Sequence, residues 1–181
     1  MSRAPVLAAT LMAMVGTAFA QETSPRIDYG FPPRDYKRGE PPARGPAMEL
    51  ALEAVQAAVA VCSAKGFKVT AAVFDSAVQP VALLTAQGAL RIAPEAATRK
   101  AFVVVHTGQP SGAAAERVKS DLDFARELSA TGKALPVRGA LPIRVGDEII
   151  GVISVAGAPP PGEADEVCAQ AGLDKVAARI K

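Results

Sequence analysis

The segment Gly139–Gly157 constrains the fold of this chain more than any other part of the sequence. It reads GALPIRVGDEIIGVISVAG, with two apolar runs on either side of Gly146–Asp147. A glycine that can adopt positive φ between two such runs predicts a tight β-hairpin. Pro142 has no backbone N–H, so it must lie where the strand ladder needs none. The second run, Ile149–Ala156, is apolar apart from Ser154, and such a strand needs a cover on both faces.

Helical and extended patterns alternate through the rest of the chain after residue 46. Apolar residues recur at helical spacing from 48 to 61, and Lys65–Gly66 is typical of a helix end. Extended patterns at 68–75 and 80–85 flank a turn and predict a first hairpin. Further helices are predicted over 94–106, 113–128 and 163–180. These elements predict an α+β fold of profilin-like architecture, in which helices pack on an antiparallel sheet of about five strands.

Residues 1–20 have the features of a signal peptide. Arg3 provides the positive charge, residues 6–15 form a short apolar run, and Thr17–Ala20 ends in the small-x-small pattern that signal peptidase cleaves. The apolar run is too short to span a bilayer comfortably. We therefore expect cleavage after Ala20, a periplasmic or secreted mature protein, and no membrane association after cleavage.

Residues 21–46 form a predicted proline-rich arm that precedes a single domain over 47–181. The arm contains six prolines among charged residues, a composition that favours extended conformations and cannot form a core. One interpretation is a flexible tether. The alternative is that Tyr29, Phe31 and Tyr36 anchor the arm on a neighbouring subunit, since aromatic residues are enriched in interfaces.

The charge balance of the chain argues against nucleic acid as a partner. Twenty basic and 18 acidic residues leave a formal net charge of +2, and the chain contains no tryptophan. Nucleic-acid binding would require a clustered basic face, and single strands would require aromatic stacking platforms. The apolar strand Ile149–Ala156 favours a homo-oligomer instead, if the helices of one subunit leave one of its faces bare.

The two cysteines, Cys62 and Cys168, lie on the first and last predicted helices. Because an exported protein meets an oxidising environment, a disulfide between them is our leading prediction. Two buried thiols or a thiolate ligand are the alternatives. The chain has no Cys-x-x-Cys motif, which excludes a thioredoxin-like site and covalent heme attachment.

His106 is the single histidine of the chain, and catalytic motifs are scarce. One histidine cannot build a multi-histidine metal site, and neither a Gly-x-Ser-x-Gly elbow nor a phosphate-binding loop is present. At the predicted helix end, His106 is suited to a structural role beside the helix dipole or to ligation of a metal. Binding is therefore favoured over catalysis. An enzymatic alternative would use Lys100 or Asp75 as a base in a small-metabolite pocket.

Three segments together resemble the GlcG/HbpS (DUF336-like) family, several of whose members bind heme. They are VTAAVFD at 69–75, ATRKA at 97–101 and the final hairpin, and the resemblance covers residues 47 to about 178. The chain departs from the family pattern at Ala77 and Val78, where the family usually has glycines in the turn after Asp75. Some heme-binding relatives place a histidine on the first helix, whereas the soft ligands here are Met48 and Cys62.

The resemblance implies heme as a cofactor, held by an axial ligand and by cations for its propionates. His106 is the first candidate for the heme iron and Met48 the second, with Lys100, Arg99 and Arg91 as propionate partners. This function would be heme storage, sensing or transfer outside the cytoplasm. The alternative is a non-catalytic oligomeric accessory or scaffold protein of an exported redox or transport system.

Overall fold

The computed structural model describes residues 42–160 and 162–181, so the predicted signal peptide and most of the arm lie outside the described residues. The helices are α1 (Met48–Ala64), α2 (Ala93–Thr107), α3 (Ser111–Arg117), α4 (Leu122–Ala130) and α5 (Glu163–Val176), followed by the 3₁₀ turn η1 (Ala177–Arg179). The strands are β1 (Thr70–Asp75), β2 (Pro80–Thr85), β3 (Ala140–Val145) and β4 (Glu148–Ala156).

The strands form one sheet in the order β2-β1-β4-β3, and all neighbouring strands are antiparallel. The hairpin predicted from the sequence is confirmed, with Gly146 at a φ of +58° between β3 and β4. The prediction of about five strands is corrected to four in the described part of the chain. The residues before β3, from 133 to 139, are irregular and add no strand.

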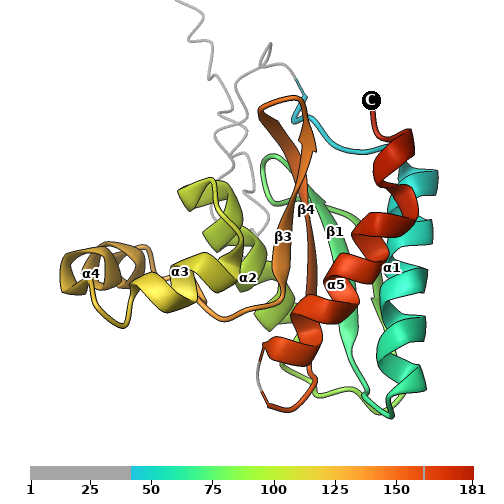
Figure 1. Ribbon diagram of the computed structural model, residues 1–181, viewed down its shortest axis with the longest axis horizontal. Helices are drawn as coiled ribbons and strands as arrows, with labels where there is room; N and C mark the ends of the chain where they lie inside the picture. Colours follow the sequence, from blue (N-terminus) through green and yellow to red (C-terminus); the bar gives the residue numbers. More distant parts are fainter. Residues whose placement is uncertain (1–41, 161) are drawn as a thin grey trace, which may run out of the picture. The chain divides into compact units, whose positions relative to one another are not determined.

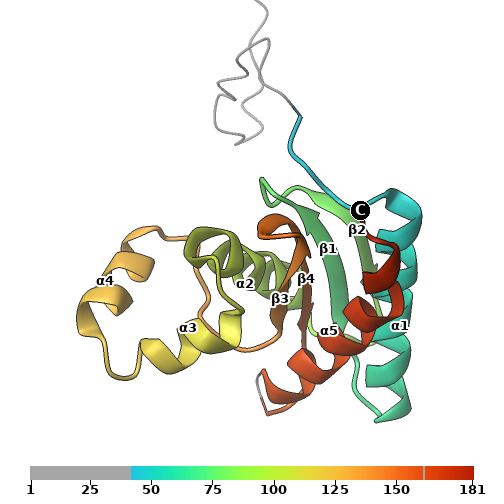
Figure 2. The ribbon, with the colours of Figure 1, turned by 45° about the horizontal axis from the view of Figure 1, so that its top comes forward.

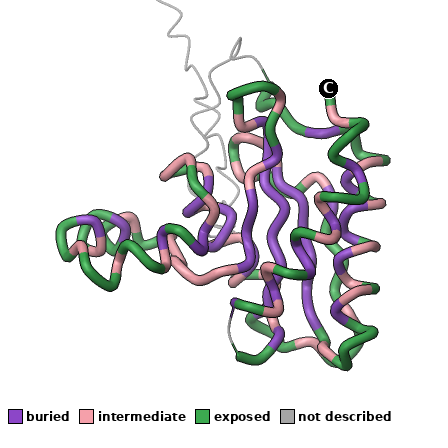
Figure 3. Tube along the Cα trace, in the orientation of Figure 1, coloured by how far each residue is buried: buried purple, intermediate pink, exposed green. Residues whose placement is uncertain are grey.

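Helices cover both faces of the sheet (Figures 1 and 2). α1 and α5 pack on one face, whereas α2 packs on the other, against β4, β1 and β3. β4 is buried along most of its length, as Figure 3 shows. The cover that this strand needs therefore comes from helices of the same chain, and β4 gives no reason for subunit association. The polar residue in the buried part of β4 is Ser154, which donates a hydrogen bond to the carbonyl oxygen of Ala97 in α2 at 2.8 Å.

The predicted helix over 113–128 is wrong as one element, because α3 and α4 occupy this region separately. The Asp121 side chain accepts a hydrogen bond from the backbone N–H of Phe124 at 3.0 Å, so Asp121 is the N-cap of α4. A shared apolar cluster joins both short helices to α2 through Val103, Ala114, Phe124 and Leu128.

The predicted disulfide between Cys62 and Cys168 is present, with an S–S distance of 2.09 Å, and it joins α1 to α5. Both cysteines are buried, and because they are bonded to each other neither offers a thiolate to a ligand. No helix in the described part of the chain is long and apolar enough to cross a membrane. Residues 42–160 and 162–181 also contain no group of three or more His, Cys, Asp or Glu side chains that could hold a metal ion.

Candidate functional site

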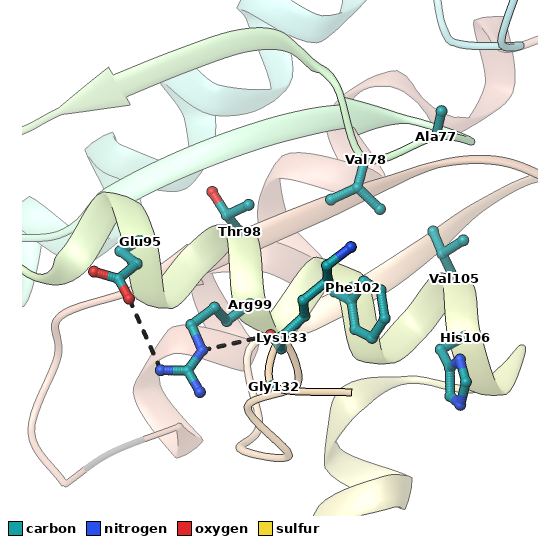
Figure 4. Close-up of a pocket in the computed structure, with 10 residues that line it drawn as sticks. All are labelled: Ala77, Val78, Glu95, Thr98, Arg99, Phe102, Val105, His106, Gly132 and Lys133. Atoms are coloured by element: carbon teal, nitrogen blue, oxygen red, sulfur yellow. Dashed lines mark hydrogen bonds and ion pairs between the residues drawn. The ribbon is translucent and has the colours of Figure 1, made fainter. Parts of the chain in front are cut away.

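A cavity with a volume of about 900 Å³ lies beside α2, on the face of the sheet opposite α1 and α5. We call it the α2 pocket (Figure 4). Its walls come from the β1–β2 turn, from α2 and from the loop after α4. The lining residues are Ala77, Val78, Glu95, Thr98, Arg99, Phe102, Val105, His106, Gly132 and Lys133.

The sequence of α2 places four of these side chains on one side of the helix. Glu95, Arg99, Phe102 and His106 follow one another at intervals of four, three and four residues, and such residues share a face. Gly108, with a φ of +71°, ends the helix just after His106. The local sequence therefore aligns the charged, aromatic and imidazole groups along the pocket.

His106 is held by one aromatic and one acidic neighbour. Its ring stacks on that of Phe102, with a centroid distance of 5.6 Å and an interplanar angle of 15°. Its Nε2 atom lies 3.4 Å from Oε1 of Glu127 in α4. A carboxylate partner of this kind helps to fix the orientation of an imidazole ring. About a third of the His106 side chain stays exposed, so the ring is accessible to a ligand.

Two cations lie along the same pocket. Arg99 donates hydrogen bonds to the carbonyl oxygens of Lys133 at 3.4 Å and Ala134 at 3.3 Å, and its guanidinium is 3.8 Å from Glu95. The ammonium of Lys133 lies 5.9 Å from the centre of the Phe102 ring. Figure 4 shows the Lys133 side chain crossing the pocket between Arg99 and Phe102. The pocket therefore combines apolar walls with positive charge.

Lys133 was missed by the sequence analysis. It follows Gly132, which adopts a φ of +64°, and the Thr131 hydroxyl accepts the backbone N–H of Lys133 at 3.1 Å. The backbone N–H of Leu135 then bonds to the carbonyl oxygen of Arg99 at 3.2 Å. The motif Thr131–Gly132 predicts a turn, but no local pattern indicates that this turn lies against α2.

The β1–β2 turn forms the opposite wall of the pocket. The Asp75 carboxylate accepts hydrogen bonds from the backbone N–H groups of Ala77 and Gln79, both at 2.8 Å. Val78 has a φ of +58°, a conformation that is strained for a β-branched residue. Its side chain packs against the apolar cluster on the α2 face. Asp75 is thus engaged in shaping the turn.

The other predicted site residues lie outside the α2 pocket. Met48 is more than half exposed at the start of α1, on the other face of the sheet. Arg91 is exposed just before α2 and does not line the pocket. Lys100 is buried and bonds to Asp165 of α5, with 2.7 Å between Nζ and Oδ2. Of the five residues predicted to bind a cofactor, the structure brings together His106 and Arg99.

Known proteins that resemble this chain share its fold over most of the described domain. The model of a family described as "Haem degrading protein HbpS-like" matches residues 47–174. The crystal structure of HbpS is 32% identical, with a TM-score of 0.66 over 76% of this chain and 95% of that chain. No curated protein sequence matches significantly.

Two further solved structures are similar. A double glutamate-to-aspartate variant of HbpS from Streptomyces reticuli is 30% identical, with a TM-score of 0.66 over 80% of this chain and 96% of that chain. A heme complex of PduOC is 18% identical, with a TM-score of 0.64 over 74% of this chain and 94% of that chain. At that identity the second likeness shows the fold alone.

Proposed function

Because this chain belongs to the HbpS-like family of haem-degrading proteins, we propose that it binds heme in the α2 pocket and stores, senses or transfers it outside the cytoplasm. One observation carries the proposal. The single histidine of the chain and two cations line the same cavity, whose volume of about 900 Å³ is within the usual range of cofactor sites. A disulfide in the domain supports an oxidising compartment.

The groups in the pocket fit what heme requires. Heme needs apolar contact for its ring, an axial donor for its iron and cations for its propionates. Val78, Phe102 and Val105 provide apolar surface, and His106 provides an imidazole. Arg99 and Lys133 provide the cations. Bound heme would supply iron redox chemistry, and our proposal for this chain is limited to binding.

Glu127 supports His106 as the axial ligand. Its carboxylate lies 3.4 Å from Nε2 and would orient the imidazole if His106 held the iron. The proposal does not use Lys100 for the propionate contact implied by the family resemblance, because its ammonium is already paired with Asp165. Arg99 and Lys133 take that role in the proposal.

Hemin titration of the mature protein, followed by absorbance, tests the proposal. We expect a saturable Soret shift that His106→Ala weakens or abolishes, because the axial bond is lost. Met48→Ala is the matched control, since Met48 is the other predicted ligand of the heme iron and lies on the opposite face of the sheet. A shift lost in Met48→Ala but kept in His106→Ala would move the site to α1. No saturable shift in the wild-type protein would reject heme binding.

Arg99→Ala and Arg91→Ala form a second matched pair. Both remove an arginine near α2, but only Arg99 lines the pocket. We expect Arg99→Ala to weaken hemin binding by about tenfold to a hundredfold, the usual scale for one lost charge-assisted hydrogen bond. Arg91→Ala is expected to bind as the wild type does. Equal losses in both variants would indicate a nonspecific charge effect.

The second candidate function is an oligomeric accessory or scaffold protein. It is favoured by the outermost strand β2, where Leu83 and Leu84 are exposed. An exposed apolar edge strand is suited to protein contacts. This candidate requires no hemin site, so a wild-type protein that self-associates but gives no saturable Soret shift would favour it over heme binding.

A further inference from the structure

A second cavity of about 320 Å³ lies near the beginning of α2 and shares no lining residue with the α2 pocket. We call it the Lys100 cavity. Its mouth includes Leu90 and Ile92, which are exposed, and its walls include Leu135 and Val137. All lining residues except Lys100 and Asp165 are apolar or glycine, so this cavity favours a small apolar molecule with one polar group.

The two polar residues of this cavity form a buried ion pair. The exposed fractions of Lys100 and Asp165 are 3% and 2%. Lys100 Nζ donates to Oδ2 of Asp165 at 2.7 Å and to the carbonyl oxygen of Val155 at 3.0 Å. The other carboxylate oxygen, Oδ1, accepts the backbone N–H of Ala158 at 2.9 Å. Among the described residues, these contacts use two of the three hydrogens that a lysine ammonium can donate.

Backbone around the ammonium is arranged to leave room for it. Gly139 has a φ of +124°, and a Cβ atom at that position would lie 2.8 Å from Lys100 Nζ. Any other residue would therefore collide with the amine as well as strain the backbone. The carboxylate beside Nζ also disfavours an anionic ligand, because a second negative charge would repel Asp165. A neutral acceptor is the polar group that fits.

We propose that the Lys100 cavity takes small apolar aldehydes or ketones and that Lys100 Nζ forms an imine with their carbonyl carbon. Asp165 accepts a proton from the ammonium, and the neutral amine adds to the carbonyl to form a carbinolamine. The carbinolamine oxygen then leaves as water. It carries one proton that came from Nζ and one that came from Asp165, and the C=N bond remains. No oxidant or reductant is consumed.

The electrostatic environment supports this chemistry. Burial lowers the pKa of the Lys100 ammonium, although the neighbouring Asp165 opposes that shift. A desolvated lysine in an apolar pocket is a recognised way to make an amine nucleophilic at neutral pH. The exposed Lys119 has no such environment, because it pairs with Glu116 at the surface. Lys119 therefore serves as an internal control for the reactivity of Lys100.

Reductive trapping of the wild-type protein tests the proposal without changing Lys100. The full mature chain is treated with limiting butanal and sodium cyanoborohydride, and the butylated lysines are mapped by peptide mass spectrometry. We expect labelling of Lys100 to exceed that of Lys119 by about tenfold, because the neutral amine is the reacting species. Labelling of exposed lysines with Lys100 unmodified would overturn the proposal.

Ala96→Phe shows whether the cavity is the route to the amine. Ala96 lines this cavity on the partly exposed side of α2, so an aromatic ring there fills the cavity and keeps the ion pair. We expect loss of the Lys100 adduct, unchanged labelling of Lys119 and an unchanged circular dichroism spectrum. An adduct retained in the variant would reject the cavity as the route. The result does not depend on heme, because neither Ala96 nor Lys100 lines the α2 pocket.

Discussion

Val78 is the residue whose local conformation conflicts most with its side chain. It holds a φ of +58° in the turn that forms one wall of the α2 pocket. A β-branched residue rarely adopts this region, at a cost of about 1–2 kcal/mol. The sequence comparison already marked Ala77 and Val78 as substitutions for glycines. The positive φ itself became visible only in the structure.

Val78→Gly and Val78→Ala form a matched pair that measures this strain. Both remove the valine methyl groups from the pocket, but only glycine relieves the positive φ. We expect Val78→Gly to be more stable than Val78→Ala by about 1 kcal/mol, because the lost strain outweighs the greater chain entropy of glycine. Urea unfolding measures the difference. A glycine variant less stable than the alanine variant would contradict the strain at this turn.

At the scale of elements, the break between α3 and α4 depends on Asp121. Its carboxylate accepts the N–H of Phe124 at 3.0 Å and an Arg117 Nε hydrogen bond at 3.0 Å. We expect Asp121→Ala to destabilise α4, whereas Asp121→Asn keeps the acceptor and most of the stability. Urea unfolding at neutral pH checks the order. Equal losses in both variants would show that the cap bond is unimportant.

The same carboxylate predicts a pH dependence. The N–H of Phe124 and then the Arg117 side chain lower the pKa of Asp121 below its usual value of 3.8. A carboxyl group with a depressed folded-state pKa stabilises the protein above its unfolded pKa, and this contribution is lost as the pH falls through the folded value. The stability difference between wild type and Asp121→Asn should therefore shrink below pH 3.8. A difference independent of pH would contradict the assignment.

Asp121 also shows how element boundaries could have been better predicted. The apolar spacing over 113–128 is continuous enough to suggest one helix, but an aspartate directly before Leu122 is a typical N-cap signal. The spacing of apolar residues alone does not indicate the break between α3 and α4. The strands were predicted more accurately, because Pro80 and Gly146 punctuate both hairpins.

At the scale of the whole molecule, the disulfide closes a loop of 106 residues between α1 and α5. We expect the double variant Cys62→Ala and Cys168→Ala to lose about 3–5 kcal/mol of unfolding free energy, because the unfolded chain is no longer constrained. Urea unfolding measures this loss. Hemin binding of the folded variant should be unchanged, since the α2 pocket lies on the other face of the sheet. Unchanged stability would show that the bond contributes little.

Self-association stays a prediction, and its most suitable surface is now β2. Leu83 is 46% exposed on this edge strand, next to Leu84. We expect a homo-oligomer whose mass, measured by light scattering, falls when both leucines are changed to lysine, because charged edges resist pairing. Leu122→Lys is the control, since Leu122 is exposed and belongs to α4, which lies away from the sheet in Figure 1. A monomeric wild-type protein would contradict the prediction.

Sequence alone determined the α+β class, both hairpins and His106 as the one imidazole donor, and it made the Cys62–Cys168 disulfide the leading prediction. These depend on neighbouring residues or on composition, because turn preference, periodicity and residue counts are local or global properties of the chain. Only the tertiary structure decided that Lys133 lines the same pocket as His106 and that Lys100 is buried against Asp165. Such pairings are set by packing between segments far apart in sequence, and no local pattern records them.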